Sequence, residues 1–124
     1  MLRESFSGNT TLPTAVVRLR KEGEEEPLQG AGTGDGPVDA AYETIKALTE
    51  TRSKLVSYTI QSITGGTDAM GEVIVTIEED HHRVTGRGHS TDIIVASAMA
   101  YVDAINRLEF KREKTVYAQG AEAP

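Results

Sequence analysis

Cysteine and tryptophan are absent from this sequence, and only two phenylalanines and four tyrosines are present. A chain without cysteine forms no disulfide, thiolate metal site or iron–sulfur cluster, and it has no cysteine nucleophile. With so few aromatic residues, the core must be built from valine, isoleucine, leucine, alanine and methionine. These suffice for one domain, because 124 residues is an ordinary domain length and is short for a two-domain enzyme.

Basic residues and long hydrophobic runs are also scarce. Thirteen lysines and arginines stand against nineteen aspartates and glutamates, so the net charge of −6 has the wrong sign for wrapping a phosphate backbone. No apolar run approaches the roughly 20 residues of a membrane span, and the start MLRESFSGNTT lacks the hydrophobic segment of a signal peptide. We therefore expect a soluble, cytoplasmic domain with neither nucleic acid nor a membrane as its partner.

An internal repeat is visible when the sequence is compared with itself at an offset of 56 residues. Residues 15–32 then align with residues 71–88 without a gap, and matches continue beyond them. The matched pairs are Val17 with Val73, Leu19 with Val75, Leu28 with Val84, Gly30 with Gly86, Gly32 with Gly88, Val38 with Ile94, and Ala40 with Ala96. Because one ungapped register over this length is hard to obtain by chance, it indicates a duplicated supersecondary unit.

Within each copy, the hydrophobic spacing changes in the same order. Residues 15–20 and 72–77 alternate as strands do, and the charged stretches 22–26 and 78–82 predict hairpins with solvated tips. A Gly-x-Gly segment follows in each copy, and then apolar residues spaced three and four apart predict a helix. These helix positions are Val38, Ala41, Tyr42, Ile45 and Leu48, and then Ile94, Ser97, Ala98, Tyr101, Ile105 and Leu108.

The expected helix starts have suitable chemistry. Pro37 falls in the first turn of one helix, where its missing N–H costs nothing. In residues 90–92, Ser-Thr-Asp, a hydroxyl or carboxylate can cap the other helix. Residues 55–63 predict a further strand, and the repeat predicts a weaker equivalent within residues 1–10.

Each copy is thus predicted to be a βββα unit. We expect an α+β domain over residues 1–110, made of two pseudo-symmetric units, about 1–50 and 55–110, with helices on one face of an antiparallel sheet. Residues 111–124 have no sustained apolar period and predict a flexible C-terminal tail.

The glycine-rich residues 30–36 resemble a nucleotide-binding loop only superficially. A dinucleotide fingerprint that begins Gly30-x-Gly32 requires glycine at position 35, where Asp35 stands, and no Gly-Lys-Ser/Thr follows. The glycines still permit close backbone approach, and free N–H groups at a helix start favour an anion such as a carboxylate. A small carboxylate ligand and a plain turn both remain open.

His81 and His82 stand beside acidic residues, which raises the question of a metal site. Adjacent strand residues point to opposite faces and are poorly placed to chelate one ion. The repeat also aligns these histidines with Glu25 and Glu26 of the first hairpin tip, so a solvated turn is the better interpretation. The sequence therefore predicts no metal site.

Two other side chains are candidates for contact with a ligand. His89 follows Gly88 near the second helix start, but close neighbours such as Ser90 and Asp92 rarely converge with a histidine as a triad. Tyr58, in a mixed polar and apolar strand, fits a core position with a bonded hydroxyl as well as it fits a pocket wall. No residue is predicted to be catalytic.

Several segments together resemble a known family. They are GDGPVDA at 34–40, YTI at 58–60, TGGTDAMGEV at 64–73, GRG at 86–88, TDII at 91–94 and ASA at 96–98. In combination they are similar to the C-terminal regulatory domain of 2-isopropylmalate synthase, over roughly residues 5–108. Citramalate synthases carry a similar domain.

The resemblance implies an allosteric, leucine-sensing module of leucine biosynthesis. In that family two βββα units form each domain, the domains pair as a homodimer, and the amino-acid inhibitor binds near the dimer interface. The catalytic part of the parent enzyme is a TIM barrel that uses a divalent metal to condense acetyl-CoA with 2-oxoisovalerate. That barrel is not in this sequence, so the chain alone is expected to be non-catalytic, with no cofactor of its own and with L-leucine as its effector.

The resemblance also implies a set of effector-binding residues. The loop of Gly34, Asp35, Gly36, Pro37 and Val38 would lie along the effector. Leu55 and Tyr58 would line its side, and Ser62, Ala69 and Gly71 would leave room for an aliphatic side chain. His89 and Thr91 would close the pocket. The family often has asparagine where Asp35 stands, which leaves the role of this carboxylate open.

Three alternatives stand beside a leucine sensor. The chain could be the isoleucine-binding regulatory domain of a citramalate synthase, because one methylene changes binding by only about 1–3 kcal/mol. It could be a dimerisation module with a vestigial effector site. It could also be a small enzyme that uses His89 with Asp92 or Asp35.

Overall fold

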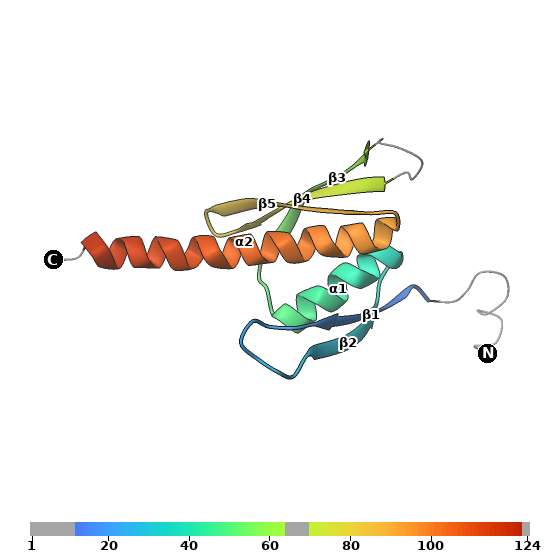
Figure 1. Cartoon of the computed structure of the whole chain (residues 1–124), viewed down its shortest axis with the longest axis horizontal. Coiled ribbons are helices and arrows are strands. Elements are labelled where there is room, and N and C mark those ends of the chain that lie inside the picture. Colours follow the sequence, from blue (N-terminus) through green and yellow to red (C-terminus); the bar gives the residue numbers. More distant parts are fainter. Residues whose placement is uncertain (1–11, 64–69, 123–124) are drawn as a thin grey trace. The chain divides into compact units, whose positions relative to one another are not determined.

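The computed structural model describes residues 12–63 and 70–122, with side chains described as far as Glu113 in the last helix. The chain divides into two compact units, Met1–Thr49 and Glu50–Pro124. Each unit has its own antiparallel sheet and its own helix (Figure 1). This arrangement confirms the predicted α+β class.

The first unit consists of a hairpin and a helix. Strand β1 (Thr14–Leu19) pairs with β2 (Leu28–Thr33), and helix α1 (Pro37–Thr49) packs against both strands. The charged residues 22–26 are exposed at the hairpin tip, as predicted. In this tip Glu24 N donates to Lys21 O at 3.0 Å, and Gly23 adopts a φ of 89°, which a residue with a side chain rarely tolerates. The weaker strand expected within residues 1–10 lies outside the described residues.

The second unit is a three-stranded meander with a long helix. Its strands are β3 (Lys54–Ile63), β4 (Met70–Glu79) and β5 (His82–Ser90), in the order β3-β4-β5, and helix α2 (Ile93–Glu122) packs on β4 and β5. A bulge at Val56 interrupts the pairing of β3 with β4. The β4–β5 turn contains Asp80, whose φ of 56° is in the left-handed region that aspartate tolerates, and exposed His81.

The two faces of this second sheet differ in chemistry. On the inner face, the side chains of Val73, Val75 and Ile77 are fully buried beneath α2. On the outer face, polar side chains pair across the strands: Arg83 with Glu78 at 2.8 Å, Thr76 with Thr85 at 3.1 Å, and Gln61 with Glu72 at 3.0 Å. Strand alternation thus gives one apolar and one polar face.

The structure also shows the duplicated unit. Strands β1 and β4 begin at Thr14 and Met70, and helices α1 and α2 begin at Pro37 and Ile93, so both pairs are 56 positions apart. This is the offset of the sequence repeat.

The repeated Gly-x-Gly segments bring each helix close to a strand. A Cβ atom added at Gly32 would lie 2.7 Å from Thr44 Oγ1 of α1. At Gly86 it would overlap the backbone of Ala100 and Ala104 in α2, and at Gly88 it would overlap the backbone of Ala96. These glycines therefore serve helix packing in both units.

Helix α2 extends beyond the domain end expected at residue 110. Its backbone is helical through Glu122. The expectation considered only the apolar period, whereas strong helix formers such as Lys111, Arg112 and Glu113 favour a helix without an apolar face. The flexibility of this segment stays a prediction. Within residues 12–63 and 70–122, no helix is long and apolar enough to cross a bilayer.

The glycine packing generates a first prediction. Gly86→Ala places a methyl group against helix backbone that cannot turn aside, so we expect it to lower the free energy of unfolding by at least about 2 kcal/mol. Urea unfolding followed by circular dichroism measures this change. The neighbouring Thr85→Ala, on the exposed face, serves as the control and should cost about 1 kcal/mol or less. Equal costs for the two variants would contradict the packing role.

Candidate functional site

The predicted effector loop forms the entry to α1. Gly36 is the N-cap residue, because Ala40 N donates the first helical hydrogen bond to Gly36 O at 2.8 Å. Pro37 follows as the first helical residue, as predicted. Asp39 Oδ2 accepts a hydrogen bond from Asp35 N at 2.8 Å, and this bond ties the loop back onto the first turn of the helix.

The entry to α2 has the same geometry and different chemistry. Its N-cap is Asp92, which stands 56 positions after Gly36. Asp92 Oδ1 accepts from Ile94 N at 2.8 Å and from Val95 N at 3.4 Å. Ser90 Oγ accepts from Asp92 N at 3.1 Å. The predicted cap is confirmed, and α2 neutralises its own N-terminus with a carboxylate.

Gly36, at the equivalent position of the first repeat, has no side chain, so α1 lacks an N-cap carboxylate. Within the described parts of the chain, no side chain accepts a hydrogen bond from Val38 N, the counterpart of the capped Ile94 N. A helix N-terminus with uncapped N–H groups carries a partial positive charge and attracts anions. The carboxylates of Asp35 and Asp39 border it, so donors for an anion and acceptors for a cation lie side by side.

A second group of predicted residues lies on the inner face of the sheet in the second unit. In the pairing of β3 with β4, Leu55 is opposite Ile77, Tyr58 is opposite Val75, and Ser62 is opposite Gly71. Opposite residues in an antiparallel pair share a face, so these residues lie on the side that α2 covers over β4 and β5.

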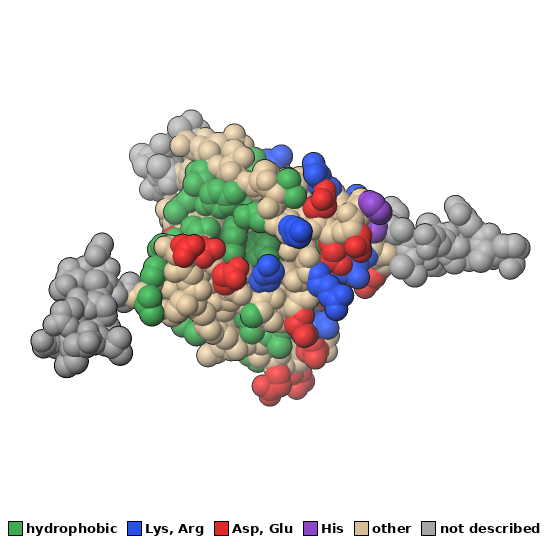
Figure 2. Space-filling model, turned by 180° about the vertical axis from the view of Figure 1, so that it is seen from behind, with side chains coloured by type: hydrophobic (Ala, Val, Ile, Leu, Met, Phe, Trp, Pro, Cys, Tyr) green, Lys and Arg blue, Asp and Glu red, His purple; other side chains and the backbone are tan. Residues whose placement is uncertain are grey.

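The inner face of β3 is left uncovered, because α2 packs on the other two strands. Leu55 is 45% exposed and Ile60 is 52% exposed, although both share the face of the buried β4 valines. Figure 2 shows hydrophobic side chains gathered beside the grey segment that joins β3 and β4. An apolar surface next to a helix start is thus available in the second unit.

Tyr58 is joined to α2 by a hydroxyl chain. Its Oη lies 2.7 Å from Ser97 Oγ, and Ser97 Oγ in turn donates to Ile93 O at 2.7 Å. Because Ser97 has a single hydroxyl proton and uses it on Ile93 O, Tyr58 must donate to Ser97. Tyr58 is half-buried and Ser97 is fully buried, so the tyrosine ring is fixed at the border of the uncovered face.

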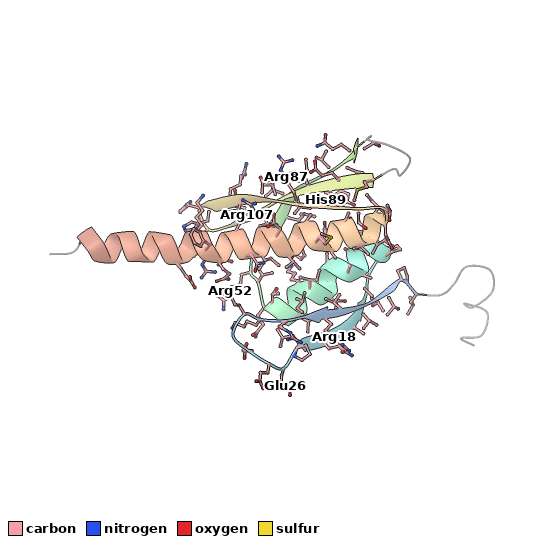
Figure 3. All side chains as sticks on the ribbon, viewed as in Figure 1. Arg18, Glu26, Arg52, Arg87, His89 and Arg107 are labelled. Atoms are coloured by element: carbon pink, nitrogen blue, oxygen red, sulfur yellow. The ribbon has the colours of Figure 1, made fainter. Side chains whose placement is uncertain are left out.

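Strand alternation separates His89 from these residues. Gly88 faces α2, so the next residue, His89, points to the opposite, polar face. There it lies opposite Glu72 in the register of β4 with β5. Figure 3 shows His89 on β5 with Arg87, which lies on the same face. Thr91 is exposed in the turn before α2, and Ala69 lies outside the described residues. The structure therefore brings together residues 34–38 in one unit and Leu55, Tyr58, Ser62 and Gly71 in the other, without His89.

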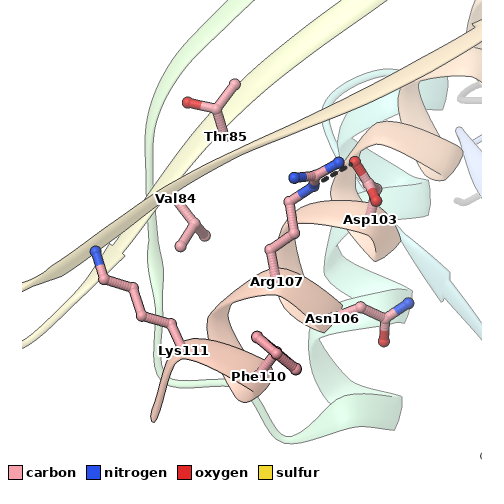
Figure 4. Close-up of a pocket in the computed structure, with 7 residues that line it drawn as sticks. All are labelled: Val84, Thr85, Asp103, Asn106, Arg107, Phe110 and Lys111. Atoms are coloured by element: carbon pink, nitrogen blue, oxygen red, sulfur yellow. Dashed lines mark hydrogen bonds and ion pairs between the residues drawn. The ribbon is translucent and has the colours of Figure 1, made fainter. Parts of the chain in front are cut away.

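A cleft of about 610 Å³ lies elsewhere in the second unit, along the open edge of β5 (Figure 4). It is lined by Val84, Thr85, Asp103, Asn106, Arg107, Phe110 and Lys111, none of which the sequence predicted as site residues. Asp103 Oδ2 accepts from Arg87 N at 3.0 Å, and Lys111 Nζ donates to Arg83 O at 3.4 Å. These contacts satisfy backbone groups of an edge strand, which explains the polar lining without a ligand.

The described residues contain no obvious metal cluster. Among them, no three histidine, aspartate or glutamate side chains are grouped closely enough to hold a metal ion. The hydroxyl chain runs from Tyr58 through Ser97 to the backbone carbonyl of Ile93. What the geometry offers is hydrogen-bond donors at a helix start and an uncovered apolar strand.

The repeat and the two differently capped helices define the class as a duplicated α+β domain. A family model for the LeuA allosteric (dimerisation) domain matches residues 5–109. The chain belongs to this family, and the match confirms the resemblance found in the sequence.

Curated relatives agree with this family. The 2-isopropylmalate synthase of Heliobacterium modesticaldum is 52% identical over 104 residues, which is 84% of this chain and 20% of that protein. The 2-isopropylmalate synthases of Carboxydothermus hydrogenoformans and Syntrophus aciditrophicus are 50% and 47% identical, each over 84% of this chain and 20% of the relative. The chain thus spans about a fifth of the length of the curated relatives it matches.

The hydroxyl chain generates a second prediction. Ser97→Ala removes the acceptor of the Tyr58 hydroxyl, so we expect the free energy of unfolding to fall by about 1–2 kcal/mol. Tyr58→Phe removes the other partner, and the double variant should cost less than the two single variants added together. Urea unfolding of all four proteins gives the coupling energy.

A matched serine is available as the control for this cycle. Ser57→Ala, at an exposed position on the same strand, should change the free energy of unfolding by about 0.5 kcal/mol or less. Strictly additive costs for Ser97→Ala and Tyr58→Phe would show that the hydroxyls do not stabilise each other.

Proposed function

We propose that this chain is the amino-acid-sensing regulatory domain of a 2-isopropylmalate synthase and that it binds L-leucine as a feedback inhibitor. Membership of the LeuA allosteric (dimerisation) domain family supports an allosteric role. The similarity to named 2-isopropylmalate synthases supports the assignment to that enzyme. The observation that carries the proposal is the glycine N-cap of α1, which leaves a helix N-terminus open where the second copy has closed its own with Asp92.

This helix start suits an amino acid better than a simple anion. The uncapped N–H groups favour the α-carboxylate, and the neighbouring Asp35 and Asp39 carboxylates favour the α-ammonium group. A ligand with a negative charge alone would meet two carboxylates without compensation. Charge complementarity therefore selects a zwitterion, and we assign the Asp35 carboxylate to the α-ammonium group of the ligand.

The second unit has an apolar surface of its own. Leu55, Tyr58 and Ser62 lie on the inner face of β3, where apolar side chains are about half exposed. Covering such a surface with an aliphatic side chain contributes about 25 cal/mol for each Å² removed from water. This face is a candidate contact for an aliphatic side chain within the second unit.

Inhibition follows only if leucine distinguishes two states of the enzyme. A ligand that binds both states equally shifts neither, however tightly it binds. In the proposed enzyme, this domain makes up about a fifth of the length, as in the relatives, and we assign catalysis to the remainder. Leucine would bias the arrangement of a homodimer and, through it, the catalytic domain. A cytoplasmic location stays a prediction.

A second candidate function is dimerisation without sensing. The exposed Leu55, Val56 and Ile60 on an edge strand suit an interface with a second copy. Sedimentation would find a dimer under either function, so binding of an amino acid distinguishes them.

Calorimetry with leucine, isoleucine and valine supplies the third prediction. We expect this 124-residue chain to bind leucine most tightly, with heat released and the melting temperature raised. Preference for isoleucine would favour the citramalate synthase alternative. No heat and no thermal shift with any of the three would contradict the sensor and leave dimerisation.

A variant that copies the second repeat into the first tests whether the start of α1 binds the carboxylate. Gly36→Asp introduces the carboxylate that Asp92 supplies to α2, so it should cap α1 and lower leucine affinity at least about tenfold. Gly36→Asn has the same shape without the charge and should lose less. If both variants bind leucine like the wild-type chain, the start of α1 is not the carboxylate site.

A further inference from the structure

Strand β5 lies at one edge of the sheet in the second unit. In the order β3-β4-β5 it pairs with β4 only, so every second residue of β5 directs its backbone N–H and C=O away from the sheet. Arg83, Thr85 and Arg87 are such residues, because Arg83 O and Arg87 N form hydrogen bonds with side chains outside the sheet. Free backbone groups along such an edge are a template for pairing with a strand of another chain.

Two side chains of α2 occupy backbone groups of this edge. Asp103 Oδ2 accepts a hydrogen bond from Arg87 N at 3.0 Å, and Lys111 Nζ donates to Arg83 O at 3.4 Å. Figure 4 shows both side chains on the helix, with Thr85 on the strand across the cleft. The atoms that an added strand would bond are therefore already bonded by α2.

The spacing of the two side chains matches the spacing of their partners. Asp103 and Lys111 are eight residues apart on a helix, which separates them by about 12 Å along its axis. Arg83 and Arg87 are four residues apart on a strand, which separates them by about 13 Å. Because the later helix residue binds the earlier strand residue, α2 and β5 run in opposite directions and both contacts form together.

The close approach of α2 at Gly86 makes the aspartate contact possible. A Cβ atom added at Gly86 would overlap the backbone of Ala100 and Ala104, so α2 lies tightly against β5. An aspartate side chain is short, and Asp103 reaches Arg87 N because its own helix backbone is this near to the strand.

The first unit blunts the equivalent edge by other means. Ala47 stands 56 positions before Asp103, and α1 ends before the position equivalent to Lys111. Strand β2 has six residues where β5 has nine, and Pro27 precedes β2 at the position equivalent to Arg83. A short edge strand and a proline both discourage strand addition. The longer β5, which contains no proline, has the two charged side chains instead.

We propose that Asp103 and Lys111 form a clasp that closes the β5 edge to a strand from a second copy of this chain. The clasp occupies backbone groups at two outward-facing residues. It also places a carboxylate and an ammonium group along the edge, and an added strand would bury both charges without new partners. This part of the second unit lies outside the proposed effector site.

Amide hydrogen exchange at Arg87 tests the contact itself. Asp103→Ala removes the acceptor, so we expect the Arg87 amide to exchange at least about tenfold faster, relative to the Val75 amide of the central strand. The Val75 reference corrects for a general loss of stability. Asp103→Asn keeps an acceptor oxygen and should keep most of the protection. An unchanged ratio in Asp103→Ala would overturn the proposal.

Arg107→Ala is the matched control for this experiment. Arg107 Nε donates to Asp103 Oδ2 at 3.1 Å, so the variant removes the ion pair of this aspartate and leaves its bond to the strand. The exchange ratio of Arg87 to Val75 should stay at its wild-type value. A rise equal to that of Asp103→Ala would show that the ion pair, and not the clasp, protects the amide.

Sedimentation velocity over a range of concentrations tests the consequence for association. In Asp103→Ala combined with Lys111→Ala, both contacts are lost, and we expect larger species than in the wild-type chain or in Arg107→Ala. Growth through β5 protects the outward amide of Thr85, which should exchange more slowly in these species than in the wild-type chain. The absence of larger species, or larger species without this protection, would overturn the proposal.

Discussion

The close approach of a helix to a strand through alternate glycines is the constraint on which the rest of the second unit depends. At Gly86 and Gly88 no Cβ fits between β5 and the backbone of α2. This contact places α2 over β4 and β5, so that it covers the buried β4 residues and leaves the inner face of β3 open. The uncovered face, the tyrosine that reaches across to the helix and the helix side chains that reach the β5 edge all follow from it.

Duplication gave the chain two helix starts, and they differ at the N-cap residue. Asp92 satisfies the N–H groups of α2 from within the chain, whereas Gly36 provides no side chain to α1. The same fold therefore stabilises one helix start with an N-cap carboxylate and leaves the N-cap of the other without a side chain.

Local patterns predicted much of the fold because they act over a few residues. Alternation and charged tips gave the hairpins, and the capping chemistry of Pro37 and Asp92 gave the helix starts. The prediction for residues 111–122 considered only an apolar stripe and missed the helix that good helix formers sustain there. The pairing of Tyr58 with Ser97 left no local sign, because the two residues are 39 positions apart.

By itself, the sequence determined the repeat, the βββα order and the family, because each of these is written in residue types at fixed spacing. Only the tertiary structure decided which predicted site residues share a surface. Register and alternation placed Leu55, Tyr58 and Ser62 on one face and His89 on the other, since neighbouring strand residues point to opposite sides. Packing also decided which side chains of α2 reach the edge of β5, because such a contact depends on how a helix lies on a sheet.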